Sequence, residues 1–508
     1  MSCRSCVLSS DLQLQNLKTI RNSKGLVVQI LRGEWPLLDP DQASINAEII
    51  QLEQLLSSYD AQFQEIQLRR CAVLVTLENR KSIYAPIRRL PRDVLTEIFH
   101  FVCTFWWPKA KEDYILASEF HGDGLDVSRL LWVLGRVCGL WRKTLHLSPA
   151  SWAQKIIVKA PFSKHAPDIL QTYLDNTGEH LLNLRVFLPS NKPSKIGEIM
   201  SLLIQSCQRW KNLILYIHTH YLHYLESISR LPVLQTIEID ILGLPRRDYR
   251  TNILLNAPQL WQGTFRTEGI HQIGLPSGIT HYSGCITCSE DLQLLSQLPK
   301  LMTCHLRYLS VPEEMPMVIT QLRHLHVDYV DILNFLIAPL LNSLAINGIP
   351  QRASSRTECL VHFLDRSRCR RQSLTIGSKA ITASQQLSST IRQILSSEAC
   401  STLSRLKFEL GSRLNDASRT FEPSLVIPNL SYLALCISRP SKDLSSVSSD
   451  LLPRCDVGWL KEIEVQFQDK EYEDILIADI RALCGGDWDM RVEEWDPLCR
   501  DHLLLSWG

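Results

Sequence analysis

The chain has 508 residues, more than the roughly 100–200 residues of one ordinary domain, although a repeat array can grow further as a single unit. Hydrophobic residues make up 45% and charged residues 21%, as in folded globular proteins. Lysine and arginine number 54 against 53 aspartate and glutamate, a net charge of +1, so no global basic field attracts nucleic acid or an anionic membrane. We therefore expect neither a nucleic-acid partner nor a membrane partner.

The cysteines and the N-terminal residues indicate an intracellular protein. The 16 cysteines are scattered, mostly beside aliphatic residues, where cysteine acts as a small buried apolar side chain. The opening "MSCRSCVLSSDLQLQ" lacks the apolar core of a signal peptide, and no apolar run reaches the ~18 residues that span a bilayer. We expect reduced thiols and a location in the cytoplasm and/or the nucleus.

Residues 1–40 show little pattern and predict a poorly ordered lead-in, whereas residues 41–84 predict one long helix. Apolar residues recur there in steps of four and three, with Arg70 in one expected apolar place. They are Ile45, Ile49, Leu52, Leu56, Tyr59, Phe63, Ile66, Val73 and Leu77. Two interpretations stay open. The helix packs this stripe within its own domain, which the aromatic residues Tyr59 and Phe63 in the stripe favour, or it forms a coiled coil that makes a homodimer.

Residues 85–155 predict a small all-α domain. Pro91 presets the backbone for a first helical turn, and an apolar stripe follows as far as Val102. A polar insertion spans about residues 108–124, with the aromatic pair Trp106-Trp107 before it. A second helix is expected from Asp126 to Leu145.

The same stretch resembles the F-box. "LPRDVLTEIF" matches its opening, "VCGLWR" its closing helix, and Pro149 with Trp152 its downstream Pro-x-x-Trp, all in the expected order. "INAEIIQLEQLL" and "PIRRLP" before it resemble the entry of mushroom-type fungal F-box proteins, although the insertion is longer than in a minimal F-box. The resemblance implies binding to the Skp-type adaptor of a cullin-RING ligase. The implied adaptor-binding residues are Leu90, Pro91, Leu95, Ile98, Val137, Cys138 and Trp141. The alternative is that they form the core of a helical hairpin.

Residues 156–508 predict a degenerate leucine-rich-repeat domain. From Trp210 onward, segments such as "LPVLQTIEIDI", "LPKLMTCHLRYL" and "IPNLSYLALCI" combine a turn residue, a leucine and a short alternating strand. Such units recur about 20–30 residues apart and stack into a continuous core, here about seven to ten of them. "DLQLLSQLPK" and "VHFLDRSRC" predict helices beside the strands. The predicted fold is thus α/β: a long N-terminal helix, an all-α F-box domain, and an α/β solenoid with a parallel sheet.

Few residues suggest chemistry. Cys285 and Cys288 with His281 nearby, or Cys3 and Cys6, lack the four-ligand spacing of a zinc site. His218, His220 and His223 fall on no single helical or strand face, so packed or solvated histidines are expected. We find no phosphate-binding loop or nucleophile elbow, and predict no catalytic, cofactor-binding or metal residues and no cofactor. The serine-rich residues 440–450 predict a flexible loop.

The resemblance implies a non-catalytic substrate receptor of an SCF-type (Skp–cullin–F-box) ubiquitin ligase. The F-box would bind the adaptor, and the repeats would hold an unknown target protein for ubiquitination. Two rivals remain: an F-box-derived interaction scaffold outside any ligase, and an enzyme whose site lies on the repeat face. A cleft with clustered carboxylates or histidines would indicate the enzyme.

Overall fold

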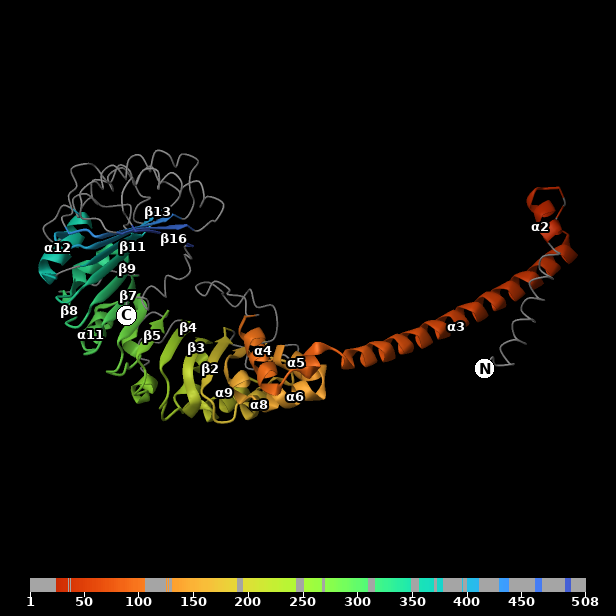
Figure 1. Ribbon diagram of the computed structural model, residues 1–508, viewed down its shortest axis with the longest axis horizontal. Coiled ribbons are helices and arrows are strands. Elements are labelled where there is room, and N and C mark those ends of the chain that lie inside the picture. Colours follow the sequence, from red (N-terminus) through yellow and green to blue (C-terminus); the bar gives the residue numbers. More distant parts are fainter. Residues whose placement is uncertain are drawn as a thin grey trace. The chain divides into compact units, whose positions relative to one another are not determined.

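The computed structural model describes two units, residues Met1–Leu95 and Thr96–Gly508, which we treat one at a time (Figure 1). The residues described are 24–34, 36, 38–105, 125, 127, 130–189, 195–243, 251–266, 270–308, 316–348, 356–369, 372–377, 395, 400–410, 429–437, 462–467 and 489–494.

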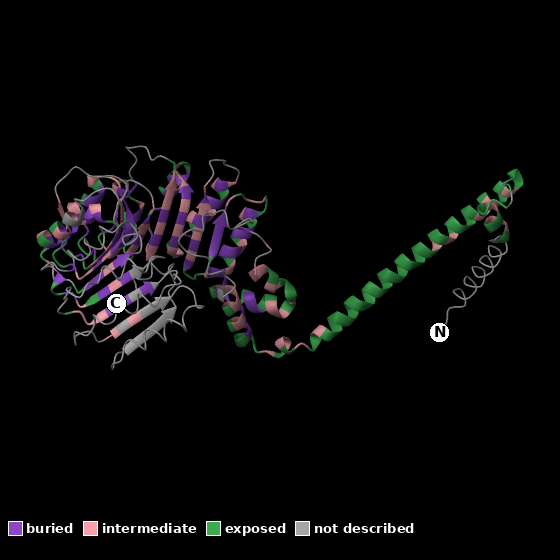
Figure 2. Cartoon of the chain, turned by 90° about the horizontal axis from the view of Figure 1, so that it is seen from above, coloured by how far each residue is buried: buried purple, intermediate pink, exposed green. Residues whose placement is uncertain are grey.

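The first unit consists of helices. Helix α3, Asp39–Ile83, confirms the predicted long helix, with Pro40 in the first turn, where a missing N–H costs nothing. The lead-in is not wholly irregular, because Lys24–Leu31 forms helix α2. A 3₁₀ turn, η1 (Pro86–Arg89), follows α3. No residue of α3 is buried, as the green helix in Figure 2 shows, so within its own unit the predicted stripe is uncovered.

Four α-helices lie in the described part of the predicted F-box segment. They are α4 (Arg92–Phe105), α5 (Leu130–Val137), α6 (Gly139–His146) and α7 (Pro149–Ala153). The prediction of one helix up to Leu145 was wrong, because Cys138 is fully extended (φ −163°, ψ 170°) and separates α5 from α6. The side chain of Arg142 bridges the break by donating from Nε to the Gly135 carbonyl at 2.9 Å. Asp126, the polar insertion and Trp106-Trp107 lie outside the described residues.

The second unit continues as a parallel-sheet solenoid, which confirms the predicted fold class. One sheet of 14 described strands runs in the order β1-β2-β3-β4-β5-β6-β7-β9-β11-β12-β13-β14-β15-β16. The strands are β1 Ile156–Lys159, β2 Leu182–Leu188, β3 Trp210–His218, β4 Thr236–Leu242, β5 Gln262–Phe265, β6 His281–Ile286, β7 Thr303–Tyr308, β9 His324–Tyr329, β11 Ser343–Gly348, β12 Ser373–Gly377, β13 Arg405–Leu410, β14 Tyr432–Ile437, β15 Glu462–Phe467 and β16 Asp489–Glu494. A small sheet pairs β8 (Met317–Val318) with β10 (Leu336–Ile337).

The estimate of seven to ten units was too low. Strands β1 and β2 precede the first predicted unit, and the segments of β6, β13 and β16 were not counted among the predicted units. The α-helices in the described segments between strands are α8 Ala166–Asn176, α9 Ile196–Gln205, α10 Leu222–Leu225, α11 Ser289–Ser296 and α12 Arg356–Ser367. Helices α11 and α12 confirm the two helices predicted there.

One backbone hydrogen bond recurs from repeat to repeat. The amide just before each of the strands β4–β7, β9 and β11–β14 donates to the equivalent carbonyl of the previous repeat, as from Gln235 to Lys211 at 2.8 Å and from Met302 to Thr280 at 2.9 Å. The step between such residues varies from 19, between Trp261 and Thr280, to 32, between Gln372 and Ser404. The stacking bond therefore stays constant while the length of the intervening segment does not.

The strands alternate between two faces of the sheet. Strand β2 shows strict alternation of buried and half-buried residues, visible as purple and pink in Figure 2, as a period of two requires. The buried set includes Leu184 and Val186 and belongs to the core. We call the face with the half-buried set the open face.

An aromatic cluster joins the F-box-like segment to the solenoid. Trp152 of α7 lies edge-on to Trp132 of α5 at 5.9 Å between ring centroids, and to Tyr173 of α8 at 5.3 Å. Its Nε1–H donates to the carbonyl of Leu145 at 3.0 Å. The Pro-x-x-Trp element thus gives the solenoid an apolar N-terminal cap, since a terminal repeat has a neighbour on one side only.

Replacing Trp152 with alanine should lower the free energy of unfolding by about 3–5 kcal/mol, because the cavity would lie at the centre of this cluster. Trp152→Phe, which keeps a ring but loses the hydrogen bond, should cost less. Leu147→Ala is the matched control, since Leu147 is 65% exposed. Urea unfolding followed by circular dichroism would measure all three, and equal midpoints for Trp152→Ala and Leu147→Ala would contradict this role.

Candidate functional site

The predicted adaptor-binding residues differ in exposure. Pro91 and Val137 are exposed, and Leu90, Ile98, Cys138 and Trp141 are half-buried. Leu95 is fully buried, so it belongs to the core and offers a partner no surface. Trp141 packs against Phe99 with ring centroids 4.9 Å apart, which fixes α6 against α4. The set therefore divides into packing residues and surface residues.

Helix α4 carries two apolar stripes. Leu95 and Phe99, four residues apart, are buried. Val94, Ile98 and Phe101 follow a second helical spacing, and Phe101 is 61% exposed. One face of α4 therefore packs into the fold, and a second apolar face remains accessible.

Helix α5 repeats this arrangement. Val133 and Val137, one turn apart, are 44% and 51% exposed, while Trp132 of the same helix joins the Trp152 cluster. Both helices therefore carry exposed apolar residues in addition to those that pack into the core of this segment.

The open face of the solenoid forms a second candidate surface. A middle row of this face runs across neighbouring strands through the register partners Glu238, Thr264, Ser283, His305 and His326. Beside it, Arg266 Nε contacts Glu238 Oε1 at 2.7 Å. Burial raises the pKa of Asp240, while the charges of Arg266 and Arg307 act in the opposite direction. The row is thus polar, charged and partly dehydrated.

The centre of this row gathers two histidines and a carboxylate. The rings of His305 and His326 stack at 4.1 Å with 7° between their planes. His305 Nε2 lies 3.4 Å from Asp328 Oδ1, which also accepts from Asn347 Nδ2 at 3.3 Å. Burial raises the pKa of Asp328, but the hydrogen bonds from His305 and Asn347 and the nearby histidine charges outweigh it, leaving that pKa well below its ordinary value.

This cluster has the composition that the enzyme alternative required. Ser283 Oγ lies 3.3 Å from His305 Nδ1, opposite the nitrogen that faces Asp328, so the three residues form a Ser–His–Asp chain. Both contacts are long for hydrogen bonds, and Ser283 is only 8% exposed. Ligand atoms of His305, His326 and Asp328 lie within 4.8 Å of one another. We call the contacts among Ser283, His305, His326, Asp328 and Asn347 the polar ladder.

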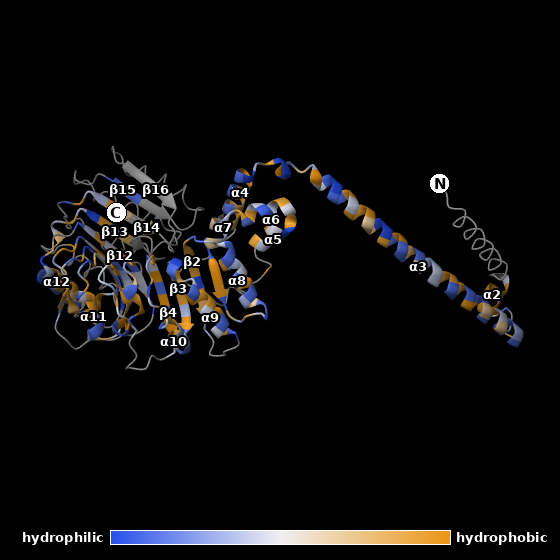
Figure 3. Cartoon of the chain, turned by 90° about the horizontal axis from the view of Figure 1, so that it is seen from below, coloured by the Kyte–Doolittle hydropathy of each residue, from blue (hydrophilic) through white to orange (hydrophobic). Residues whose placement is uncertain are grey.

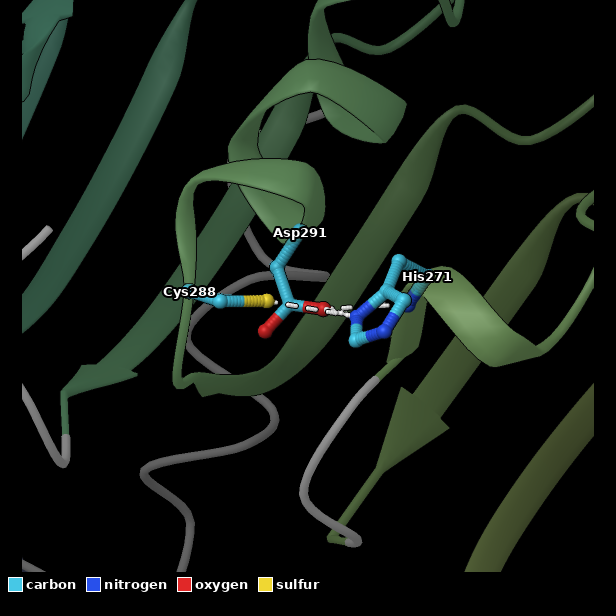
Figure 4. A group of neighbouring side chains, drawn as sticks. All are labelled: His271, Cys288 and Asp291. Atoms are coloured by element: carbon cyan, nitrogen blue, oxygen red, sulfur yellow. Dashed lines mark hydrogen bonds and ion pairs between the residues drawn. The ribbon is translucent and has the colours of Figure 1, made fainter. Parts of the chain in front are cut away.

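A second cluster joins His271, Cys288 and Asp291 (Figure 4). Asp291 Oδ1 accepts from the backbone N–H of His271 at 3.0 Å and contacts its Nδ1 at 2.8 Å. Its Oδ2 accepts from the backbone N–H and the hydroxyl of Thr287, both at 2.9 Å. Burial raises the pKa of Asp291, and these donors outweigh burial and lower it overall.

This second cluster does not have the geometry of a cysteine triad. Cys288 Sγ approaches His271 at Nδ1, 3.2 Å away, which is the nitrogen that also faces Asp291. A nucleophile and its orienting acid must contact opposite nitrogens of the ring. Burial raises the pKa of the Cys288 thiol to about 11, so it stays protonated at neutral pH. The cluster therefore acts as a brace between η5 (Ile270–Gln272) and the start of α11.

Cys285, Cys288 and His281, which were considered as zinc ligands in the sequence, each contact a different residue in the structure. Cys285 Sγ faces the carbonyl of Arg266 at 4.0 Å, whereas Cys288 contacts His271, and His281 contacts Thr280. Cys3 and Cys6 lie outside the described residues. Of the three histidines that the sequence placed on no single face, His218 and His220 come together with their Nδ1 atoms 2.8 Å apart, because the chain turns through η3 (Thr219–Tyr221) directly after β3.

Two open-face histidines should make the solenoid less stable in mild acid. Burial lowers the pKa of His281 and of His324, and the charges of His324 and Arg323, respectively, lower them further. The unfolded chain, with histidine near pH 6.5, therefore binds protons more readily. Stability should be constant above that pH and fall below it, by less than about 1.4 kcal/mol per pH unit for each half-exposed ring. Urea midpoints between pH 7.5 and 5.5 should fall less in the variant His281→Gln/His324→Gln, and equal slopes would contradict the assignment.

Removing the Asp291 carboxylate should destabilise the solenoid. Asp291→Ala leaves two backbone donors without their acceptor and should cost at least about 2 kcal/mol, whereas Cys288→Ser should cost under about 1 kcal/mol. Thermal unfolding at neutral pH measures both. A larger loss for Cys288→Ser than for Asp291→Ala would show that the thiol organises the cluster.

The fold is assigned from the strand order of the chain itself and not from comparison with known proteins. No family model matches the chain, and no curated protein matches it. Among solved structures, an internalin from Listeria monocytogenes is 12% identical over 72% of this chain and 93% of that chain, with a TM-score of 0.30. None of the described helices has the length and apolar character of a membrane span. The chain contains a solenoid of the leucine-rich-repeat type, built from stacked parallel strands.

Proposed function

We propose that this protein is a non-catalytic receptor in which the helical segment binds an adaptor and the solenoid holds a target protein. The observation that carries the proposal is the second, accessible apolar stripe on α4 and on α5, within the segment that resembles the F-box. Apolar helical surface flanked by polar residues is the usual means of binding a partner helix. The adaptor would be of the Skp type, and the assembly an SCF-type ubiquitin ligase in the cytoplasm and/or the nucleus.

The open face suits a protein target. It presents charged, histidine and aromatic side chains along many strands, such as the Glu238–Arg266 pair and Phe187 beside Tyr216, whose ring centroids lie 6.3 Å apart. Mixed charge of this kind selects partners by electrostatic complementarity. Aromatic residues and arginine supply most of the binding energy in protein interfaces.

The contribution of such a receptor is proximity. By holding adaptor and target at once, the chain would raise the effective concentration of target lysines near the ubiquitin-carrying subunit, with no covalent chemistry of its own. The polar ladder and the Asp291 brace need no catalytic role in this mechanism. The alternative is a scaffold that keeps the helical segment and the solenoid without joining a ligase.

Adaptor binding can be tested by mutating exposed positions. Val137→Glu places a charge on the accessible stripe of α5 and should weaken binding of a purified Skp-type adaptor at least tenfold, without loss of fold. Leu90→Ala/Pro91→Ala should weaken binding as well. Leu147→Glu is the matched control, because Leu147 is also exposed, at 65% against 51% for Val137, and lies outside the predicted set. Size-exclusion chromatography with light scattering on the full chain would measure the complex.

Two outcomes separate the alternatives. A one-to-one complex that Val137→Glu disrupts and Leu147→Glu preserves would support the receptor. A folded wild-type chain that binds no Skp-type adaptor would overturn the ligase assignment and leave the scaffold.

A further inference from the structure

Helix α3 exposes an apolar seam with the period of a coiled coil. Its seam positions alternate steps of three and four residues over more than four heptads, without glycine or proline. Eight of the nine apolar seam residues are exposed, and Figure 3 shows apolar positions recurring along the helix. A 45-residue helix with such a seam is stable in water when a second helix covers it.

The charges of α3 are segregated along its length. Residues 39–65 contain six acidic residues and no lysine or arginine: Asp39, Asp41, Glu48, Glu53, Asp60 and Glu65. Residues 66–83 contain four basic residues and one acidic residue: Arg69, Arg70, Arg80, Lys81 and Glu78. The helix dipole favours such charges only in the first and last turns. It therefore accounts for Asp39 and Lys81 but not for Glu53, Asp60 or Glu65.

We infer that α3 mediates self-association by forming an antiparallel coiled coil with α3 of a second copy of this chain. In the antiparallel orientation, each acidic half lies along the basic half of the other helix. In the parallel orientation, like charges lie together. Charge complementarity thus selects both the partner, an identical helix, and its direction.

The seam fits this orientation over the whole helix. The register that places Ile45 against Leu77 of the second copy also places Asp39 against Ile83, so the two helices overlap from end to end. Its successive layers are Ile45–Leu77, Ile49–Val73, Leu52–Arg70, Leu56–Ile66 and Tyr59–Phe63, and each occurs twice. In every layer the two facing residues therefore differ, and no residue meets its own copy.

Arg70 gives the strongest contrast between the two orientations. In a parallel dimer Arg70 would meet Arg70 of the second copy inside the seam, where two like charges repel and neither is solvated by the apolar neighbours. In the antiparallel dimer it meets Leu52, next to Glu53 on the same helix. The long arginine stem can then cover apolar surface while its charge lies near a carboxylate.

The mass of the full-length protein tests the association. Light scattering over a concentration series should give twice 58.1 kDa for the wild type. Leu56→Glu/Phe63→Glu, in the seam, should be monomeric. Leu68→Glu/Val75→Glu is the matched control and should stay dimeric, because both residues are exposed and lie outside the seam on the outer face of the same helix. Circular dichroism checks that each variant folds.

The orientation is tested with one spin label for each chain, introduced as a non-canonical amino acid at Ala43. With a rise of 1.5 Å per residue and a dyad at residue 61, two such labels should be about 54 Å apart in an antiparallel dimer and about 10 Å apart in a parallel one. A label at Ala61 should give a short distance in either case.

A dimer with the long Ala43 distance, lost in the seam variant alone, would establish the proposal. A monomeric wild type, a short Ala43 distance, or a seam variant that remains dimeric would each overturn it. Adaptor binding does not enter these measurements, so this proposal and the proposed function can fail separately.

Discussion

The solenoid depends on one constraint: a single strand-and-helix unit cannot bury its own apolar face, and only a stacked neighbour can cover it. From β4 to β14, the repeated bond from the residue before a strand to the equivalent carbonyl of the previous unit helps the strand pairing to hold the units together. Because this bond is made by the backbone, the side chains of the open face are not needed to hold the repeats together. This is why that face can gather charges and histidines, such as His305 beside His326, without loss of the fold.

Stacking also requires an end. Trp152 and Trp132 cover Tyr173 at the first helix of the solenoid, so the helical segment ends the array with aromatic rings where a further repeat would otherwise be needed. The same segment keeps Val133 and Val137 accessible on α5. One short stretch of sequence thus combines a structural cap and a candidate contact surface, and helix α5 contributes different residues to each.

The parts predicted from sequence are those that repeat. Strands such as β4 and β14 follow a leucine and a turn residue, and α3 follows an unbroken heptad pattern, so periodicity suffices to find them. Strand β6 has the sequence "HYSGCI", in which no leucine marks the unit, and it was missed. The break at Cys138 was missed for a different reason: extended backbone between two helices depends on tertiary contacts such as Arg142 to Gly135. The Asp291 cluster was invisible as well, because His271 and Asp291 become neighbours only when consecutive repeats stack.

Burial separates residues that a sequence motif treats alike. In the F-box-like stretch, Leu95 and Val137 carry equal weight as matches, yet Leu95 is fully buried and Val137 is half exposed. A motif records which residue types recur, and both packing and binding preserve apolar residues. Mutating Leu95 would therefore weaken any interaction through loss of the fold, whereas Val137 can report on binding itself. The same reasoning applies to α3, where Phe63 and Leu68 are both apolar and exposed, and only their heptad positions distinguish a contact residue from its control.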